Sequence, residues 1–115
     1  MVQSPMLECS FFIPLYRDAN VSDGQSHDPE AWDWLENELY KRFRGGTTTS
    51  VQHRGFYEDP DTKQQVTDES FRYIVAVEET KLDDLRQMLS LACVLFQQKC
   101  IYLSVAGHVE FIAPP

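Results

Sequence analysis

Residues 42–62 read RFRGGTTTSVQHRGFYEDPDT, and this stretch contains the signals for a helix end, a strand and a turn. Gly45 and Gly46 follow a basic segment, as glycines commonly do where helices end. The β-rich residues 47–58 then predict a strand, and the Asp-Pro-Asp at positions 59–61 predicts a turn after it. A helix is therefore expected before this stretch, and a further strand is expected after the turn.

Upstream of this stretch, the sequence predicts one strand and one helix. Residues 6–17 alternate between apolar and polar positions, as a half-buried strand does, and residues 18–28 form a polar loop. A helix over residues 28–43 follows, because Asp28 suits the N-cap, Pro29 suits the first helical position, and apolar residues recur at four-residue spacing.

Downstream, residues 58–69 form an acidic linker and residues 70–79 predict a second β-rich strand. A helix capped by Thr80 comes next, and residues 100–112 predict a last strand with a bulge or bend at Gly107. The core stripe of this second helix comprises Leu82, Leu85, Leu89, Ala92 and Phe96. Met88, Leu91 and Leu95 widen that stripe beyond what one sheet face needs.

The order of these elements predicts the fold class. We expect one α+β domain over residues 1–115, a ferredoxin-like β-α-β-β-α-β sandwich. Right-handed crossovers then give a four-stranded antiparallel sheet with two helices on one face.

The opening stretch also carries a family resemblance. The chain resembles a family of small uncharacterised bacterial proteins in three short patterns. These are Phe-x-x-Gly-x-Thr, then a glycine followed by an aromatic residue and an acid, and then Glu-x. The matching residues are Phe43, Gly46, Thr48, Gly55, Tyr57, Asp59, Glu69 and Ser70, and the resemblance spans residues 12–111. Tyr57 stands where that family often has tryptophan, and the loop before the first helix is longer here. The resemblance implies the same β-α-β-β-α-β order, and it carries over no catalytic residues to this chain.

The composition of the chain indicates which partners and which cellular compartment are expected. The net charge of −8 disfavours nucleic acid as a partner, because affinity for phosphates comes from Lys and Arg. No apolar run approaches the ~18 residues of a membrane span, and no basic segment precedes the apolar part of the N-terminus, so we expect a cytoplasmic protein. The odd count of three cysteines, without a Cys-x-x-Cys pair, favours reduced thiols.

The predicted strand after Gly46 carries a candidate site. His53, Gly55 and Tyr57 share one face of that strand, and Arg54 lies on the other. These groups could carry proton transfer near neutral pH. Alternatively, His53 is a half-exposed residue at a strand end and Gly55 marks a bulge, and we favour this second interpretation.

The sheet face that points away from the helices is a second candidate surface. It is predicted to carry Phe12, Tyr16, Arg72, Ile74 and Tyr102, and an exposed apolar face of this kind more often marks an interface. The candidate ligand-binding residues are therefore His53, Arg54, Tyr57, Tyr16, Arg72 and Tyr102. No metal or cofactor is expected, since the histidines lack ligand spacing and the acids Glu58, Asp59 and Asp61 fit a solvated turn.

Three hypotheses for function stay open. The leading one is a cytoplasmic homo-oligomer, such as a homodimer formed through the open sheet face, that binds a small ligand or regulates without chemistry of its own. The second is a small cofactor-independent enzyme with His53, Arg54 and Tyr57 around a pocket between the sheet face and loop 18–28. The third is a subunit that docks to a basic protein partner through its acidic surface. None of them involves nucleic acid or a membrane.

Overall fold

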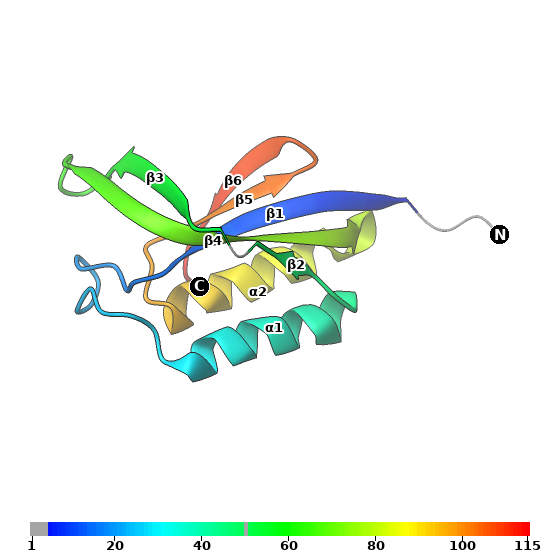
Figure 1. Ribbon diagram of the computed structural model, residues 1–115. Helices are drawn as coiled ribbons and strands as arrows, with labels where there is room; N and C mark the ends of the chain where they lie inside the picture. Colours follow the sequence, from blue (N-terminus) through cyan, green and yellow to red (C-terminus); the bar gives the residue numbers. More distant parts are fainter. Residues whose placement is uncertain (1–4, 50) are drawn as a thin grey trace.

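A sheet covered on one face by two helices makes up residues 5–49 and 51–115, which the computed structural model describes (Figure 1). Both helices lie on the same side of the sheet, as predicted. The elements are β1 (Met6–Pro14), α1 (Pro29–Phe43), β2 (Thr47–Thr48), β3 (His53–Glu58), β4 (Gln65–Glu78), η1 (Glu79–Lys81), α2 (Leu82–Leu95), β5 (Ile101–Val105) and β6 (His108–Ile112).

The strand order confirms the ferredoxin-like fold. The sheet runs β2-β4-β1-β5-β6, with β3 also paired to β4, and every pairing is antiparallel. The central strand β1 pairs with β4 from Met6↔Glu78 to Pro14↔Ser70. The predicted count of four strands was wrong, because the sheet has six within residues 5–49 and 51–115.

Two of the predicted strands are each divided. The strand expected at residues 47–58 is β2 and β3, and Ser50 between them lies outside the described residues. The strand expected at residues 100–112 is the hairpin of β5 and β6. Its turn has positive φ at both Ala106 (49°) and Gly107 (89°), which is the backbone of a tight two-residue hairpin turn rather than of a bulge.

The strand β4 is longer than predicted. It begins at Gln65, so residues 65–69, which were assigned to an acidic linker, pair with β3 instead. The pairing of Arg54↔Glu69, Gly55↔Asp68 and Phe56↔Thr67 is continuous, and the predicted bulge at Gly55 is therefore wrong.

Both helices have ends that differ from the predicted ones. Asp28 occupies the N-cap of α1 without a side-chain capping bond in the described structure, and its carboxylate lies 3.6 Å from the Arg17 guanidinium. The residue in left-handed conformation after α1 is Arg44 (φ 65°), not a glycine, and its N–H donates to the Tyr40 carbonyl (2.9 Å). Lys81, not Thr80, is the N-cap of α2.

The core lies between the sheet and the helices. From α2 and the residue after it, Leu85, Met88, Leu89, Ala92, Cys93 and Phe96 are buried there. They meet Cys9, Phe11 and Ile13 of β1, Tyr73, Val75 and Val77 of β4, and Ile101, Leu103 and Val105 of β5. Burial of these side chains supplies the main driving force for the fold. Within residues 5–49 and 51–115, neither helix combines the length and apolarity that a membrane crossing requires.

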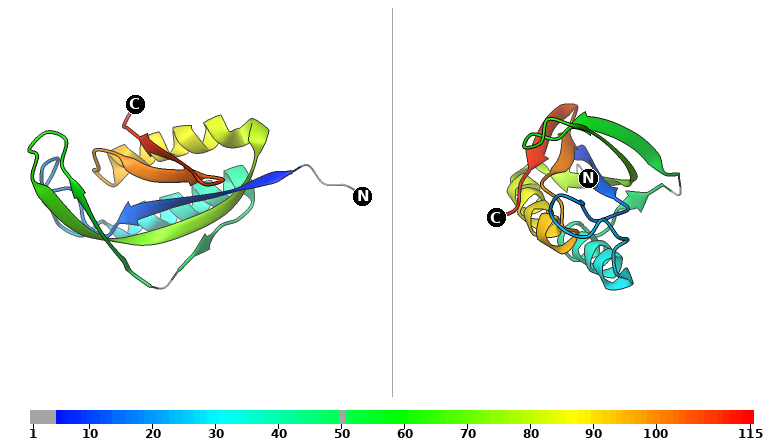
Figure 2. Two further views of the ribbon diagram at one scale, coloured as in Figure 1. Left: turned by 90° about the horizontal axis from the view of Figure 1, so that it is seen from above. Right: turned by 90° about the vertical axis from the view of Figure 1, so that its left-hand side faces the viewer.

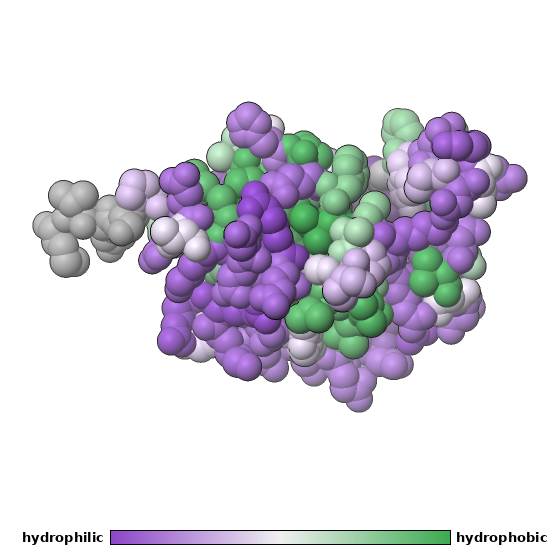
Figure 3. Space-filling model, turned by 180° about the vertical axis from the view of Figure 1, so that it is seen from behind, coloured by the Kyte–Doolittle hydropathy of each residue, from purple (hydrophilic) through white to green (hydrophobic). Residues whose placement is uncertain are grey.

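Apolar side chains also reach the surface at the back of the molecule, where hydrophobic residues gather in the middle of the view (Figure 3). Those of α2 and β6 that are exposed are Leu91, Val94, Leu95, Val109 and Phe111. Leu91 and Leu95, two of the residues predicted to widen the apolar stripe of α2 beyond what one sheet face needs, are 41% and 42% exposed.

Candidate functional site

The sheet face opposite the helices holds a cavity. The β3–β4 hairpin and the β5–β6 hairpin both rise on that side of β1 (Figures 1 and 2). Between them is a cavity of about 800 Å³ with Phe12 and Pro14 of β1 among its lining residues. Its size is within the range of small-molecule sites in proteins.

Aromatic side chains contribute much of the cavity lining. They come from β1, β3, β5 and β6 and are Phe12, Phe56, Tyr57, Tyr102 and Phe111. Three of them form a connected set, since the Tyr102 ring lies edge-on to Phe12 (5.5 Å between centroids) and to Phe111 (5.8 Å). Phe56 and Phe111 leave 72% and 68% of their surface exposed, so the cavity has an apolar rim open to solvent.

Four of the six predicted ligand-binding residues line this cavity: His53, Arg54, Tyr57 and Tyr102. At the start of β3, His53 pairs with Ser70, and its ring lies edge-on to Phe12 (5.5 Å). Its Nε2 is 3.4 Å from the Thr49 hydroxyl.

The other two predicted residues, Tyr16 and Arg72, do not line the cavity. The regular alternation ends at Pro14, so Tyr16 lies past β1 with its side chain half exposed and its carbonyl bonded to Gln98 Nε2 (2.9 Å). The Arg72 guanidinium instead donates to the Ser10 hydroxyl (3.4 Å).

Two carboxylates outside the predicted set of ligand-binding residues also line the cavity, Asp68 on β4 and Asp18 in the loop after β1. Burial raises the pKa of the Asp68 carboxyl, and the negative charge of Asp18 raises it further. The absence of a side chain at Gly55 makes room for Asp68, because a Cβ there would lie 3.1 Å from Asp68 Oδ1.

The acids affect the other titratable groups of the cavity. Burial, followed by the charges of Asp68 and Asp18, raises the pKa of Tyr57 to about 12. Burial and Asp18 likewise raise the pKa of Cys100. At neutral pH the Tyr57 hydroxyl and the Cys100 thiol therefore keep their protons, so they can donate hydrogen bonds but are poor nucleophiles.

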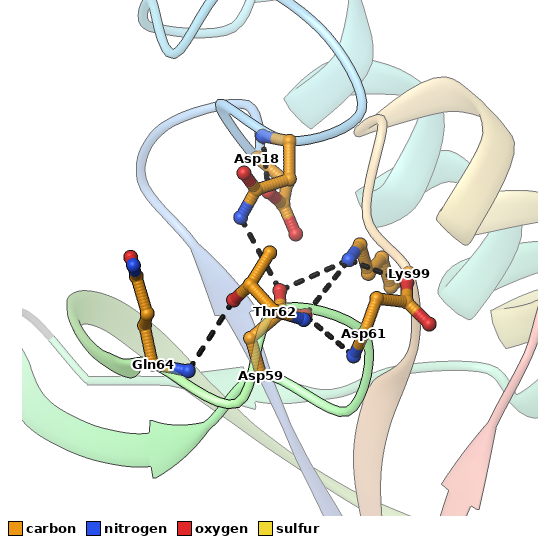
Figure 4. A network of polar contacts seen from close by, with 7 residues as sticks. Asp18, Asp59, Asp61, Thr62, Gln64 and Lys99 are labelled. Carbon is orange, nitrogen blue, oxygen red and sulfur yellow. Dashed lines mark hydrogen bonds and ion pairs between the residues drawn. The ribbon is translucent and has the colours of Figure 1, made fainter.

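One end of the cavity is bounded by a polar network around Asp59 (Figure 4). Asp59 is 1% exposed, which corrects the predicted solvated turn at this residue, whereas the Asp61 side chain is 74% exposed. The Lys99 ammonium donates to both Asp59 oxygens (3.0 Å each) and to Asp61 (2.7 Å). Hydrogen bonds from the Thr62 N–H and from Lys99 lower the pKa of the Asp59 carboxyl to about 2.

Among residues 5–49 and 51–115, no three His, Cys, Asp or Glu side chains gather in a group that could hold a metal ion. The three histidines lie in different surroundings. His27 is buried against Trp32 and Phe96, His53 lines the cavity, and His108 is exposed at the start of β6.

Comparison with known proteins identifies two structures of similar fold. A phage SAM lyase in complex with S-methyl-5'-thioadenosine aligns over 98% of this chain and 93% of its own, with a TM-score of 0.70 and 18% sequence identity. A phage SAM lyase in the apo state aligns over 98% and 94%, with a TM-score of 0.64 and 15% identity. No protein-family model and no curated protein sequence matches the chain. At these identities the similarity establishes a common fold, and function must be argued from the cavity.

Proposed function

We propose that this chain binds S-adenosylmethionine (SAM) in the cavity and cleaves it as a lyase, releasing S-methyl-5'-thioadenosine. The observation that carries the proposal is the cavity's combination of an aromatic lining with the carboxylates of Asp68 and Asp18. The common fold with phage SAM lyase, over nearly the whole of both chains, supports it. Of the three hypotheses drawn from the sequence, the cavity thus favours the small enzyme.

The cavity has the chemistry that a cationic nucleoside requires. SAM carries an adenine ring and a sulfonium cation on one molecule. Aromatic side chains such as Phe12 and Tyr102 provide stacking surfaces for the adenine and attract cations through their ring electrons. Asp68 and Asp18 attract the sulfonium electrostatically, and the partly apolar surroundings strengthen this attraction.

The proposed reaction breaks the bond between the sulfonium sulfur and the γ-carbon of the amino-acid arm. The electron pair of that bond goes to sulfur, which becomes the neutral thioether of S-methyl-5'-thioadenosine. Because no water is added, the arm leaves either by closing on its own carboxylate as a lactone or by losing a proton. In the first route the substrate's own carboxylate is neutralised together with the sulfonium, and in the second a protein carboxylate that takes the proton is neutralised instead.

Specific residues take different parts in this proposal. Tyr57, which stays protonated, is assigned as a hydrogen-bond donor to the substrate rather than as a base. Asp68 is assigned to the sulfonium, and it is the group that would accept a proton if the arm left by elimination. His53 and Arg54 lie at the β3 side of the cavity, where they can contact the carboxylate of the amino-acid arm.

The test is incubation of the purified chain with SAM and quantification of S-methyl-5'-thioadenosine by mass spectrometry. We expect its release without incorporation of ¹⁸O from labelled water at the γ-carbon of the amino-acid product. Tyr57→Phe should slow the release, whereas Tyr16→Phe, at a tyrosine outside the cavity, should not. No release, together with no calorimetric binding of S-methyl-5'-thioadenosine, would refute the proposal. Binding without release would instead favour the ligand-binding module.

Self-association through the open sheet face also belongs to the proposal. The exposed apolar rim, which includes Phe56 and Phe111, supports it because exposed aromatic side chains beside a cavity commonly lie in interfaces. Light scattering on wild type and on Phe56→Ser tests it, and a monomer at ~50 μM wild-type protein, well above a typical ~1 μM Kd, would contradict it. The cytoplasmic setting expected from the sequence is kept as part of the same proposal.

A further inference from the structure

The outer part of the β3–β4 hairpin has little apolar packing to hold it. Among the described strands, β3 pairs with β4 alone, and most of its side chains are exposed. Residues 65–69 of β4 lie beyond the register that β4 shares with β1. Yet this hairpin supplies Tyr57, Phe56 and Asp68 to the cavity. Something other than the core must fix its position.

The Asp59 network ties this hairpin to two other segments of the chain (Figure 4). Asp59 Oδ1 accepts from the N–H groups of Asp61 (2.8 Å) and Thr62 (3.0 Å), which shapes the turn itself. Lys99, in the segment before β5, donates to both oxygens of Asp59. From the loop after β1, the Asn20 amide donates to Asp59 Oδ2 (3.2 Å).

These contacts lie next to the proposed substrate cavity. Glu58, Pro60 and Lys99 are among its lining residues, and Tyr57 is two residues before Asp59. The Lys99 charge is already neutralised by Asp59 and Asp61, with its side chain 23% exposed. Lys99 is therefore suited to hold the wall of the cavity and not to bind an anionic part of a ligand.

We infer that Lys99 and Asp59 are positioning residues of this cavity: their ion pair fastens the turn of the β3–β4 hairpin to the segment before β5 and holds Tyr57 in place. The consequence for ligand affinity rests on the proposed function. The fastening itself is a property of the protein without ligand, and it can be measured separately.

The test compares Lys99→Met with Arg86→Met. Arg86 is a matched control, since it also bonds two carboxylates, Glu110 (2.8 Å) and Asp83 (2.8 Å), but in a pairing of α2 with β6. Hydrogen–deuterium exchange of peptides covering residues 55–69 should be faster in Lys99→Met and unchanged in Arg86→Met. Lys99→Arg, which can reach the same carboxylates, should restore slow exchange.

The second readout is binding of S-methyl-5'-thioadenosine, a neutral probe whose affinity is insensitive to the charge removed with Lys99. We expect its Kd to rise ~10-fold in Lys99→Met, as for a displaced binding wall, with KM for SAM rising more than kcat falls. If Lys99→Met fails to fold because Asp59 is left unpaired, Asp61→Asn provides a milder variant, since Asp61 is the exposed partner of Lys99.

The outcomes separate the two proposals. Unchanged exchange in residues 55–69 of Lys99→Met, or an unchanged Kd, would overturn the positioning role. If wild type neither binds nor cleaves, the proposed function fails, and the exchange comparison alone then supports or overturns the fastening. An equal rise of Kd in Arg86→Met would also overturn it, because the effect would then be one of general destabilisation.

Discussion

Replacing Asp68 by asparagine should change ligand affinity and protein stability in opposite directions. The substitution keeps the size of the side chain and removes its charge. Two unit charges ~5 Å apart attract by ~3 kcal/mol at an effective dielectric constant of ~20. Solvent reaches the partly exposed Asp68, so we expect a loss of ~1–2 kcal/mol, or ~5–30-fold, in affinity for a cationic ligand.

Stability should rise in the same variant. The pKa of Asp68 in the folded chain is raised above its ordinary value by burial and by Asp18. A raised carboxyl pKa means that stability is highest at low pH and is lost as the pH rises through the folded pKa, where the buried group must ionise. The asparagine side chain carries no charge, so this loss disappears and the variant should be the more stable one at pH 7.

The assay is calorimetric titration with two ligands. Sinefungin, a SAM analogue that carries an ammonium group and resists cleavage, reports on the cation, and S-methyl-5'-thioadenosine reports on the neutral part. Asp68→Asn should weaken the binding of sinefungin and leave the Kd of S-methyl-5'-thioadenosine within ~2-fold of the wild-type value. Asp33→Asn, on the exposed face of α1, should change neither affinity. Equal losses for both ligands, or no loss for sinefungin, would refute the assignment of Asp68 to the sulfonium.

Three further predictions concern the fold. Leu89→Ala, at a fully buried position of α2, should lower the free energy of urea unfolding by ~2–5 kcal/mol. Leu91→Ala, at a position of the same helix that is 41% exposed, should lower it by less than ~1 kcal/mol. Similar losses in the two variants would mean that the inner face of the helix is misassigned. Gly107→Ala should cost ~1 kcal/mol or more by the same assay, because φ is 89° there, and an unchanged midpoint would contradict that backbone. Burial lowers the pKa of His27, so its contribution to stability is present above about pH 6.5 and is lost as the pH falls below that value. Unfolding from pH 7.5 to 5 should show this loss in wild type and in His108→Gln but not in His27→Phe, and a loss of equal size in all three would exclude His27 as its source.

The parts of the fold that the sequence predicted depend on local signals. The alternation over residues 6–17 predicted a half-buried strand, and Cys9, Phe11 and Ile13 of β1 are indeed buried in the core. The apolar spacing in the second helix correctly placed Leu85 and Leu89 there. Such periodicities follow from the geometry of strands and helices and need no knowledge of the partners. The order of elements, together with the handedness of crossovers, was then sufficient for the ferredoxin-like topology.

The division of the strands could not be predicted in the same way. In residues 65–69 the turn-forming and acidic composition outweighed a weak alternation in which Val66 and Asp68 share a face. That alternation becomes a strand because β3 is available to pair with it across the turn. Ala106 has no turn preference in its own right, and its positive φ is imposed by the pairing of β5 with β6.

The residues of the candidate site were predicted less completely than the strands. His53 and Tyr57 could be selected because they stand close together in a short stretch of sequence. Asp18, Asp68 and Lys99 could not, because the chain brings them to the cavity from three separate segments. Asp59 and Lys99 are 40 positions apart, and only the folded hairpin places their charges within 3.0 Å.

Two parts of the strand β4 lie in different surroundings, one in the core and the other beside the cavity. Residues 70–78 of β4 pair with β1 above the helices, where burial of Tyr73, Val75 and Val77 stabilises the fold. Residues 65–69 continue the strand past the end of β1, where β3 is the pairing partner among the described strands and Asp68 lines the cavity. A strand extended in this way can bend around a ligand because little packing opposes the movement, but it then needs a local restraint such as the Asp59–Lys99 ion pair. Substitutions in residues 70–78 should therefore lower stability before they affect ligand binding. Substitutions in residues 65–69 should weaken ligand binding before they lower stability.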